Sequence, residues 1–245
     1  MPTKIVCIGD SITAGYTGPN SPGWEPLWPT RWGSYSDQTV AYPYQLGLLL
    51  PQTTTVINMG MSGNTAGDYG QPLLWGFPQN MLARFPANVL AYNPQIVIIQ
   101  GGMNDTNFIT SRVTIYTVWA PAIEAMCELA LENHIIPVLG LVTPDAANTI
   151  RAEMNVWLQA YASDNGFALI DFYDALDDPN NPGYLNPIYQ GISVHPNAAG
   201  YIAMANVAAP VVLPLIKAIP ADEIEYVTVT TSTDESITVP IGWNV

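Results

Sequence analysis

Hydrophobic residues gather along the chain in five short runs that are rich in β-branched side chains. The runs are Lys4 to Ile8, Thr54 to Asn58, Gln95 to Gln100, Ile135 to Leu141 and Ala168 to Phe172. Runs of this length and composition are typical of buried parallel strands.

Between these runs, two stretches repeat apolar residues at the spacing of a helix face. One stretch contains Ile123, Met126, Cys127, Ala130 and Leu131, and the other contains Ile150, Met154, Trp157, Leu158 and Tyr161. The alternation of strands and helices predicts an α/β fold, a flavodoxin-like three-layer sandwich with a five-stranded parallel sheet in the order 2-1-3-4-5. In such a fold the crossovers are right-handed and the site lies at the carboxyl ends of the strands.

Residues 16–44 interrupt that alternation with a long insertion rich in Gly, Pro and aromatic residues, among them Trp24, Trp28 and Trp32. A loop packed by its own aromatic side chains is one interpretation. The other is a substrate wall, because aromatic faces suit the apolar faces of sugar rings. The second interpretation favours a glycan ester over a long acyl chain.

The last residues, 221–245, follow the final helix and form a C-terminal β extension to a domain of residues 1–220. Two β-like stretches flank Ser232 to Glu235 and predict a hairpin. An unpaired edge there could pair with another subunit, so we expect that a homo-oligomer can form through this extension.

The net charge of the chain excludes some classes of binding partner. Only 11% of residues are charged, against roughly 25% in typical domains, and the formal net charge is −14. This charge would repel nucleic acid and anionic membrane surfaces, so we expect a small neutral or cationic substrate, with neither nucleic acid nor membrane as a partner. The acidic, charge-poor composition also suits an acidic environment.

We expect no membrane span, because no apolar run approaches about 18 residues. Met1 to Ile8 lacks the charged and apolar regions of a signal peptide, which favours a cytoplasmic location, or an extracellular one if a leader has been removed.

Cys7 and Cys127 are interpreted as buried thiols, with no disulfide framework or metal site.

The first predicted strand runs directly into Gly9, Asp10 and Ser11. A serine at a strand-to-helix turn lies where α/β sites form, although such a serine is more often a helix N-cap than a nucleophile. The surrounding residues are not the Gly-x-Ser-x-Gly elbow of α/β hydrolases, because position 13 is Thr.

The second and third strands run into turns that carry possible hydrogen-bond donors. Asn58 to Thr65 includes Gly60, and Gly101 to Asp105 includes Asn104. Glycines let backbone N–H groups approach a ligand, and an Asn side chain offers an N–H₂ donor. If strand one is central, both turns flank Ser11, where an oxyanion hole would have to lie. Each turn alone is equally consistent with ordinary turn chemistry.

A general base for Ser11 must come from elsewhere, and the chain has only two histidines. His134 follows a predicted helix, where a role at the helix end is expected. His195 precedes Pro196 and Asn197 just before the last helix, which returns to the sheet near strand one. His195 is therefore the predicted base.

Taken together, Gly9-Asp10-Ser11, Gly60 in its Asn-x-Gly context, Gly102-x-Asn104-Asp105 and His195-Pro196-Asn197 resemble four motifs of the SGNH (GDSL-like) hydrolases. They occur in the same order and over most of residues 4–218. The resemblance implies an acyl-serine intermediate, no cofactor or metal, and an oxyanion hole from the N–H of Ser11, the N–H of Gly60 and the side chain of Asn104. Ser11 would be the nucleophile and His195 its base.

One position departs from that family. Its members usually carry an Asp three residues before the His, and this chain has Ile192 there. Either a backbone carbonyl holds the imidazole, or a carboxylate from the fifth strand region does. The candidate carboxylates are Asp171, Asp174, Asp177 and Asp178, each of which could instead serve as a loop or helix cap.

The sequence thus predicts a serine esterase acting on a short-chain carboxylic ester, with an acetylated carbohydrate as the favoured substrate. The alternative is a noncatalytic glycan-binding or structural protein on the same fold. A lipase is less favoured because no long apolar lid helix is evident, and a thioesterase remains open.

Overall fold

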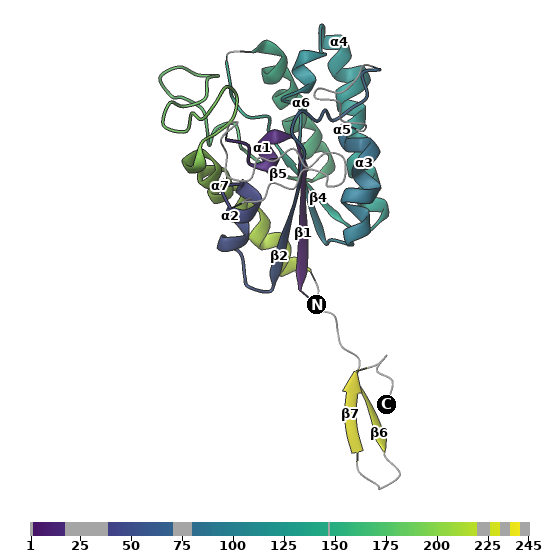
Figure 1. The fold of residues 1–245 in the computed structure, drawn as a ribbon. Coiled ribbons are helices and arrows are strands. Elements are labelled where there is room, and N and C mark those ends of the chain that lie inside the picture. Colours follow the sequence, from purple (N-terminus) through teal and green to yellow (C-terminus); the bar gives the residue numbers. More distant parts are fainter. Residues whose placement is uncertain are drawn as a thin grey trace.

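The computed structural model describes residues 2–17, 39–70, 80–146 and 148–219, together with the backbone of two strands at 226–230 and 236–240. Trp24, Trp28 and Trp32, the predicted substrate wall, lie outside the described residues. The described helices and strands of the main body follow each other in the alternating order that the hydrophobic pattern predicts (Figure 1).

Five parallel strands make one sheet in the order β2-β1-β3-β4-β5, which confirms the predicted topology. They are β1 (Thr3–Gly9), β2 (Thr54–Gly60), β3 (Ile96–Gln100), β4 (Ile136–Gly140) and β5 (Ala168–Ile170). In the register, Gly9 at the end of β1 lies opposite Gly60 on β2 and Gln100 on β3. The carboxyl ends of the three strands that precede the predicted motifs therefore meet at one edge.

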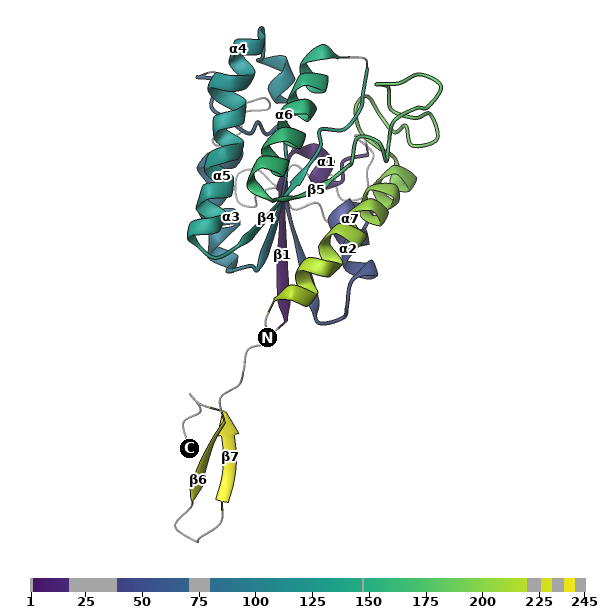
Figure 2. The same cartoon turned by 180° about the vertical axis from the view of Figure 1, so that it is seen from behind.

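The strands are apolar at most of their positions because helices cover both faces of the sheet. Val6 and Ile8 of β1 belong to one core with α3 (Met81–Asn88), α5 (Ala120–Glu132) and α6 (Thr149–Asn165). The alternating residues Ile5 and Cys7 belong to a second core with α2 (Tyr42–Leu49) and α7 (Ala198–Ala218). Figure 2 shows these two helix groups on opposite sides of the sheet.

The helices connect these strands. They are α1 (Ser11–Ala14), α2 (Tyr42–Leu49), α3 (Met81–Asn88), α4 (Arg112–Thr114), α5 (Ala120–Glu132), α6 (Thr149–Asn165) and α7 (Ala198–Ala218), with short 3₁₀ turns at Leu90–Tyr92 and Asp105–Asn107 and a π-helical segment at Ile115–Trp119. The helix faces expected from spacing lie in α5 and α6. Leu131 is an exception, because it lies at the end of α5 and is exposed.

Helix α7 contradicts the expectation that no stretch is long and apolar enough to span a bilayer. Its 21 residues meet that criterion by length and composition alone. One face of α7, including Tyr201, Met204 and Val212, is buried in the second core. Core helices share this composition because their buried face must be apolar, and here Ala and Val also occupy other positions of the helix.

The two cysteines are buried, as expected, and burial raises the pKa of Cys7 and of Cys127 to about 12. Both thiols therefore stay protonated at neutral pH. In the C-terminal extension, β6 (Tyr226–Thr230) and β7 (Ser236–Pro240) pair antiparallel, as the hairpin pattern predicts.

Candidate active site

Ser11 is the first residue of α1, and its hydroxyl is not used to cap that helix. Asp10 is the N-cap instead, and its Oδ1 accepts a hydrogen bond from the N–H of Ile12 at 2.9 Å. The short helix ends at Gly15, which has a left-handed φ of 86°. Because Asp10 performs the capping, the Ser11 hydroxyl is free to contact a side chain from elsewhere.

That side chain is His195, which lies 184 positions further along the chain. Its Nε2 is 2.8 Å from the Oγ of Ser11. The loop around His195 is held by main-chain bonds: the N–H of Gly191 donates to the carbonyl of His195, and the N–H of His195 donates to the carbonyl of Ile192, both at 3.0 Å. The two residues that the sequence predicted as nucleophile and base are thus in hydrogen-bond contact.

The other ring nitrogen of His195 meets a backbone carbonyl. Its Nδ1 is 3.1 Å from the carbonyl oxygen of Ile192, the residue at the position where an aspartate was expected. A carbonyl can only accept, so Nδ1 must carry the proton and Nε2 must offer its lone pair to Ser11. This contact selects the tautomer that a general base needs.

In the part of the chain that the structure describes, no carboxylate is hydrogen-bonded to this imidazole. Within the described residues, the hydrogen bonds of the His195 ring go only to Ser11 and Ile192. The strand-five aspartates serve their own loops, since Asp171, Asp177 and Asp178 accept backbone N–H groups from Asp174, Gly183 and Asn180. Of the two alternatives for orienting His195, the structure therefore has the backbone carbonyl.

Tyr16 also fixes the imidazole, and sequence reasoning did not single it out. Its ring meets that of His195 edge-on, with centroids 4.6 Å apart and an interplanar angle of 70°. The backbone of Tyr16 is held at both ends, because its N–H donates to Ser11 and its carbonyl accepts from the hydroxyl of Tyr201 at 2.8 Å. The ring is therefore placed by the same turn that carries Ser11.

The pKa of His195 is lowered, chiefly because burial disfavours the charged imidazolium. The hydrogen bond to Ile192 and the charge of Asp145 oppose that effect. The neutral imidazole, which is the form able to accept the Ser11 proton, thus persists to lower pH than for an ordinary histidine.

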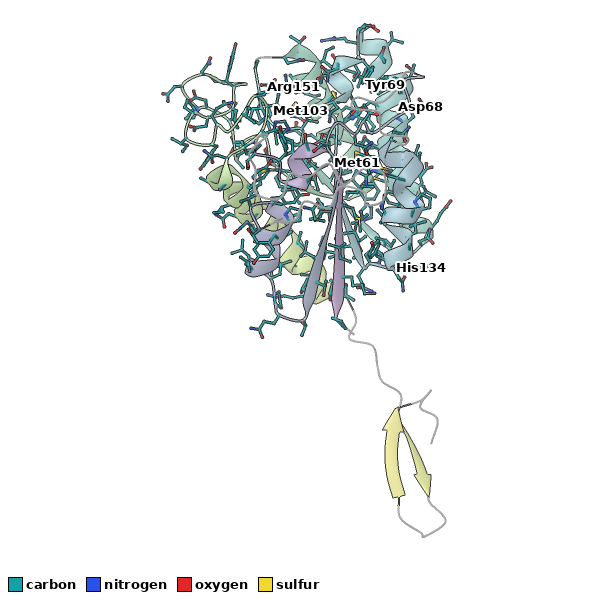
Figure 3. All side chains as sticks on the ribbon, in the orientation of Figure 1. Met61, Asp68, Tyr69, Met103, His134 and Arg151 are labelled. Carbon is teal, nitrogen blue, oxygen red and sulfur yellow. The ribbon has the colours of Figure 1, made fainter. Side chains whose placement is uncertain are left out.

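His134, the other histidine, is exposed and follows α5 with a left-handed φ of 59°. Figure 3 shows it at the far end of the molecule from Met103, the residue before Asn104, and from Arg151. It cannot reach Ser11. Its place at the end of a helix matches the expectation from sequence.

The hydrogen bonding of Gly60 argues against its predicted role as an oxyanion donor. Its N–H already donates to the Oδ1 of Asn58 at 2.9 Å. A Cβ at this position would lie 2.1 Å from the backbone nitrogen of Ala14. The absence of a side chain at position 60 therefore serves the close approach of α1 to the end of β2.

Gly63, three residues later, is the alternative oxyanion donor, because its N–H is not used as that of Gly60 is. It is buried, has a φ of 76°, and within the described residues its N–H has no acceptor. The turn that contains it is tied to the end of β1, because the N–H of Met61 donates to the carbonyl of Gly9 at 3.0 Å. The sequence carries a signal for Gly63 in the Ser62-Gly63-Asn64 turn, whereas the Asn-x-Gly context favours Gly60.

Asn104 lies beside this turn. Its Nδ2 donates to the carbonyl of Asn64 at 3.0 Å, which uses one of its two amide N–H groups and leaves the other for a ligand. The next residue, Asp105, is buried and accepts from the N–H of Ala66 and the hydroxyl of Tyr69. The turns after β2 and β3 are thus joined by side-chain bonds from two adjacent residues.

Two buried carboxyl groups lie beneath the site. Burial raises the pKa of Asp10 to about 7 and that of Asp105 to about 6.

Within the described ranges, no group of three or more His, Cys, Asp or Glu side chains could hold a metal ion.

Comparison with known proteins identifies the family. The GDSL-like lipase/acylhydrolase family matches residues 7–203. A lipolytic protein of the G-D-S-L family from Desulfitobacterium hafniense is 30% identical, with a TM-score of 0.65 over 85% of this chain and 99% of that one. No curated protein matches the sequence significantly.

More distant structures share the fold. A carbohydrate acetylesterase family member from Sinorhizobium meliloti is 17% identical, with a TM-score of 0.65 over 88% of this chain and 99% of that one. An aryl esterase from M. smegmatis is 16% identical, with a TM-score of 0.64 over 89% of this chain and 100% of that one. The matched family and the order of its motifs along the sheet show that this chain belongs to the GDSL-like lipase/acylhydrolase family and is an esterase.

Proposed function

We propose that this protein hydrolyses a short-chain carboxylic ester through an acyl-serine intermediate formed on Ser11. The observation that carries the proposal is the 2.8 Å contact between the Ser11 hydroxyl and Nε2 of His195, with Nδ1 held by Ile192. Burial, a fixed tautomer and direct contact are what a general base needs to activate a serine.

In the first half of the reaction, Ser11 Oγ attacks the ester carbonyl while Nε2 of His195 takes the hydroxyl proton. Negative charge then develops on the former carbonyl oxygen. We assign its donors as the N–H of Ser11, the N–H of Gly63 in place of Gly60, and the free amide N–H of Asn104. The Ser11 N–H is available because the first N–H groups of a helix have no partner within it.

Collapse of the tetrahedral intermediate breaks the bond to the alcohol, which leaves with the proton from Nε2. Water then repeats the sequence: Nε2 takes its proton as the hydroxide adds to the acyl carbon. The second tetrahedral intermediate collapses by breaking its bond to Ser11 Oγ, which takes the proton back from Nε2 and frees the carboxylic acid. Throughout, the imidazolium is stabilised by a carbonyl dipole at Nδ1 rather than by a full negative charge.

An acetylated carbohydrate is the substrate class we favour. The proposal is supported by the similarity in fold to a carbohydrate acetylesterase and by the three tryptophans at positions 24, 28 and 32, whose faces suit sugar rings. A net charge of −14 also favours a neutral ester over an anionic one.

The test compares wild type with Ser11→Ala and His195→Ala on three substrate types: an aryl acetate, an aryl octanoate and an acetylated oligosaccharide. We expect wild type to prefer acetate over octanoate and to deacetylate the sugar. Each variant should lose nearly all turnover, since members of one catalytic unit fail together.

Turnover by Ser11→Ala equal to wild type would refute the mechanism. A preference for octanoate would refute the short-chain assignment but not the mechanism. If wild type hydrolysed none of the esters but bound the oligosaccharide, the noncatalytic alternative would hold instead.

A further inference from the structure

Arg84 in α3 is an arginine buried behind the candidate site. It is 2% exposed, in a chain with only six Lys and Arg residues. Its guanidinium donates to the carbonyl of Gly9 from Nη2 at 2.7 Å, to the carbonyl of Met59 from Nη1 at 2.8 Å, and to Oδ1 of Asn64 from Nε at 2.7 Å. One planar group thus contacts the ends of β1 and β2 and the turn that follows β2.

Two of these acceptors, Gly9 and Asn64, lie close in sequence to oxyanion donors of the proposed function. Gly9 is two residues before Ser11, and Asn64 directly follows Gly63. The carbonyl of Asn64 in turn accepts from Nδ2 of Asn104 at 3.0 Å. Arg84 is therefore two steps, covalent or hydrogen-bonded, from Gly63 and from Asn104, and three steps from Ser11.

The need to give these acceptors hydrogen-bond donors does not by itself explain why a positively charged side chain is buried here. The Gly9 carbonyl already accepts from the N–H of Met61. Burying a guanidinium carries a large desolvation penalty, and Arg differs from other donors in presenting its N–H groups in a rigid planar fork. That fork can hold three acceptors in fixed relative positions.

We infer that Arg84 is a positioning residue that sets the geometry of the oxyanion donors on Ser11, Gly63 and Asn104. This inference rests on the proposed function. Arg84 acts through the main chain of Gly9 and through Asn64, and it does not touch the ester. His195 is outside its contacts, so its influence falls on transition-state charge rather than on the base.

The test measures kcat and KM on an aryl acetate for Arg84→Lys and Arg84→Met. Lys keeps the charge, but its three N–H groups radiate from one nitrogen, so they cannot reach acceptors that are spread around three nitrogens of a planar guanidinium. We expect kcat to fall about 10-fold for Lys and about 100-fold for Met, within the range for loss or misplacement of an oxyanion donor. KM should change less than about threefold. The acid limb of the pH profile of Arg84→Lys should stay in place, because Lys keeps the positive charge that faces the carboxyl group of Asp10 and because His195 is outside the contacts of Arg84.

Val212→Ala is the control for a purely structural effect. Val212 is fully buried in α7, in the core on the opposite face of the sheet from α3. All variants are assayed well below their Tm. Val212→Ala should lower Tm while leaving kcat near that of wild type, whereas Arg84→Lys should lower kcat whatever its Tm.

A second variant keeps the inference testable if Arg84→Met does not fold. Asn64→Ala removes the side chain that Nε of Arg84 contacts, and the double variant Asn64→Ala with Arg84→Lys closes a mutant cycle. If Arg84 acts through Asn64, the double variant loses less kcat than the product of the two single losses. Multiplicative losses would overturn that route.

The inference fails if Arg84→Lys keeps wild-type kcat, or if its acid limb moves together with the loss of kcat. Ser11→Ala separates this failure from failure of the proposed function. If Ser11→Ala is inactive while Arg84→Lys is fully active, only the role of Arg84 is refuted. If Ser11→Ala is active, the proposed function itself is refuted.

Discussion

At position 192 the chain carries an isoleucine whose main-chain carbonyl, not its side chain, accepts from Nδ1 of His195. A carbonyl fixes the tautomer as well as a carboxylate would. It stabilises the imidazolium less, because it offers a dipole rather than a full charge. The lowered pKa of His195 agrees with this, since burial outweighs the hydrogen bond and the charge of Asp145.

Replacing Ile192 with Asp tests this account of the base. A carboxylate that reaches the ring stabilises imidazolium, raises the pKa of His195 and so protonates the base at higher pH. We expect the acid limb of kcat/KM to move upward by about one pH unit. The measurement is the pH profile of aryl acetate hydrolysis.

Ile192→Ala is the matched control, because it removes the side chain but keeps the carbonyl, and its acid limb should not move. The four aspartates near strand five supply the contrary outcome. If Ile192→Asp causes no shift and replacing one of Asp171, Asp174, Asp177 or Asp178 by Ala abolishes activity, a carboxylate completes a triad after all.

The position of the short helix α1 depends on contacts that only glycine allows. A Cβ on Gly60 would lie 2.1 Å from the backbone nitrogen of Ala14, and one on Gly9 would lie 2.0 Å from Oγ1 of Thr13. The helix that begins with Ser11 can therefore lie directly against the ends of β1 and β2. This contact fixes the direction from which Ser11 meets His195.

Gly60→Ala should push α1 away from the sheet. We expect a loss of stability of about 1–3 kcal/mol, as for other overpacked cores, and a large loss of kcat because Ser11 moves with α1. Gly47→Ala is the control, since Gly47 lies within α2 and its Cβ would be at ordinary contact distance, 3.7 Å, from Val56. That change should be neutral or slightly stabilising. Thermal unfolding and aryl acetate turnover report both effects, and an active, stable Gly60→Ala protein would contradict the account.

At the scale of the whole molecule, the buried carboxyl groups link stability to pH. The pKa of Asp10 is raised to about 7 and that of Asp105 to about 6, both from 3.8. The folded state therefore binds protons more tightly than the unfolded state, so the stability from these groups is full in acid and is lost as pH rises toward 7. The lowered pKa of His195 acts in the opposite direction, but it is one group against two.

We expect the Tm to be lower at about pH 8 than at about pH 5 by roughly 3 °C or more, the change that about 1 kcal/mol produces in a domain of this size. Asp10→Asn should reduce this difference, because the amide stays neutral and keeps an oxygen for the N–H of Ile12. Asp164→Asn, a change at an exposed position of α6, should not. A Tm that rises from pH 5 to pH 8 would contradict the prediction. Greater stability in acid would fit the charge-poor, acidic composition.

Local sequence determined the sheet and the identity of the two central residues. Strands buried on both faces must be apolar at nearly every position, so each leaves a run that can be read from the chain, and the β-α alternation then restricts the strand order. Ser11 and His195 were recognisable because each follows or precedes a regular element at a fixed spacing in a known set of motifs. Each of these features is encoded by a few neighbouring residues.

Tertiary structure alone decided which atoms surround Ser11 and His195. Nδ1 of His195 contacts a main-chain carbonyl. Every residue has such a group, so no residue type in the sequence indicates this contact. The choice between Gly60 and Gly63 depends on where each N–H points, and the contacts of Arg84 join segments up to 75 positions apart. Directions of backbone groups and meetings between distant segments are set by packing of the whole sheet and its helices, and a one-dimensional pattern does not record them.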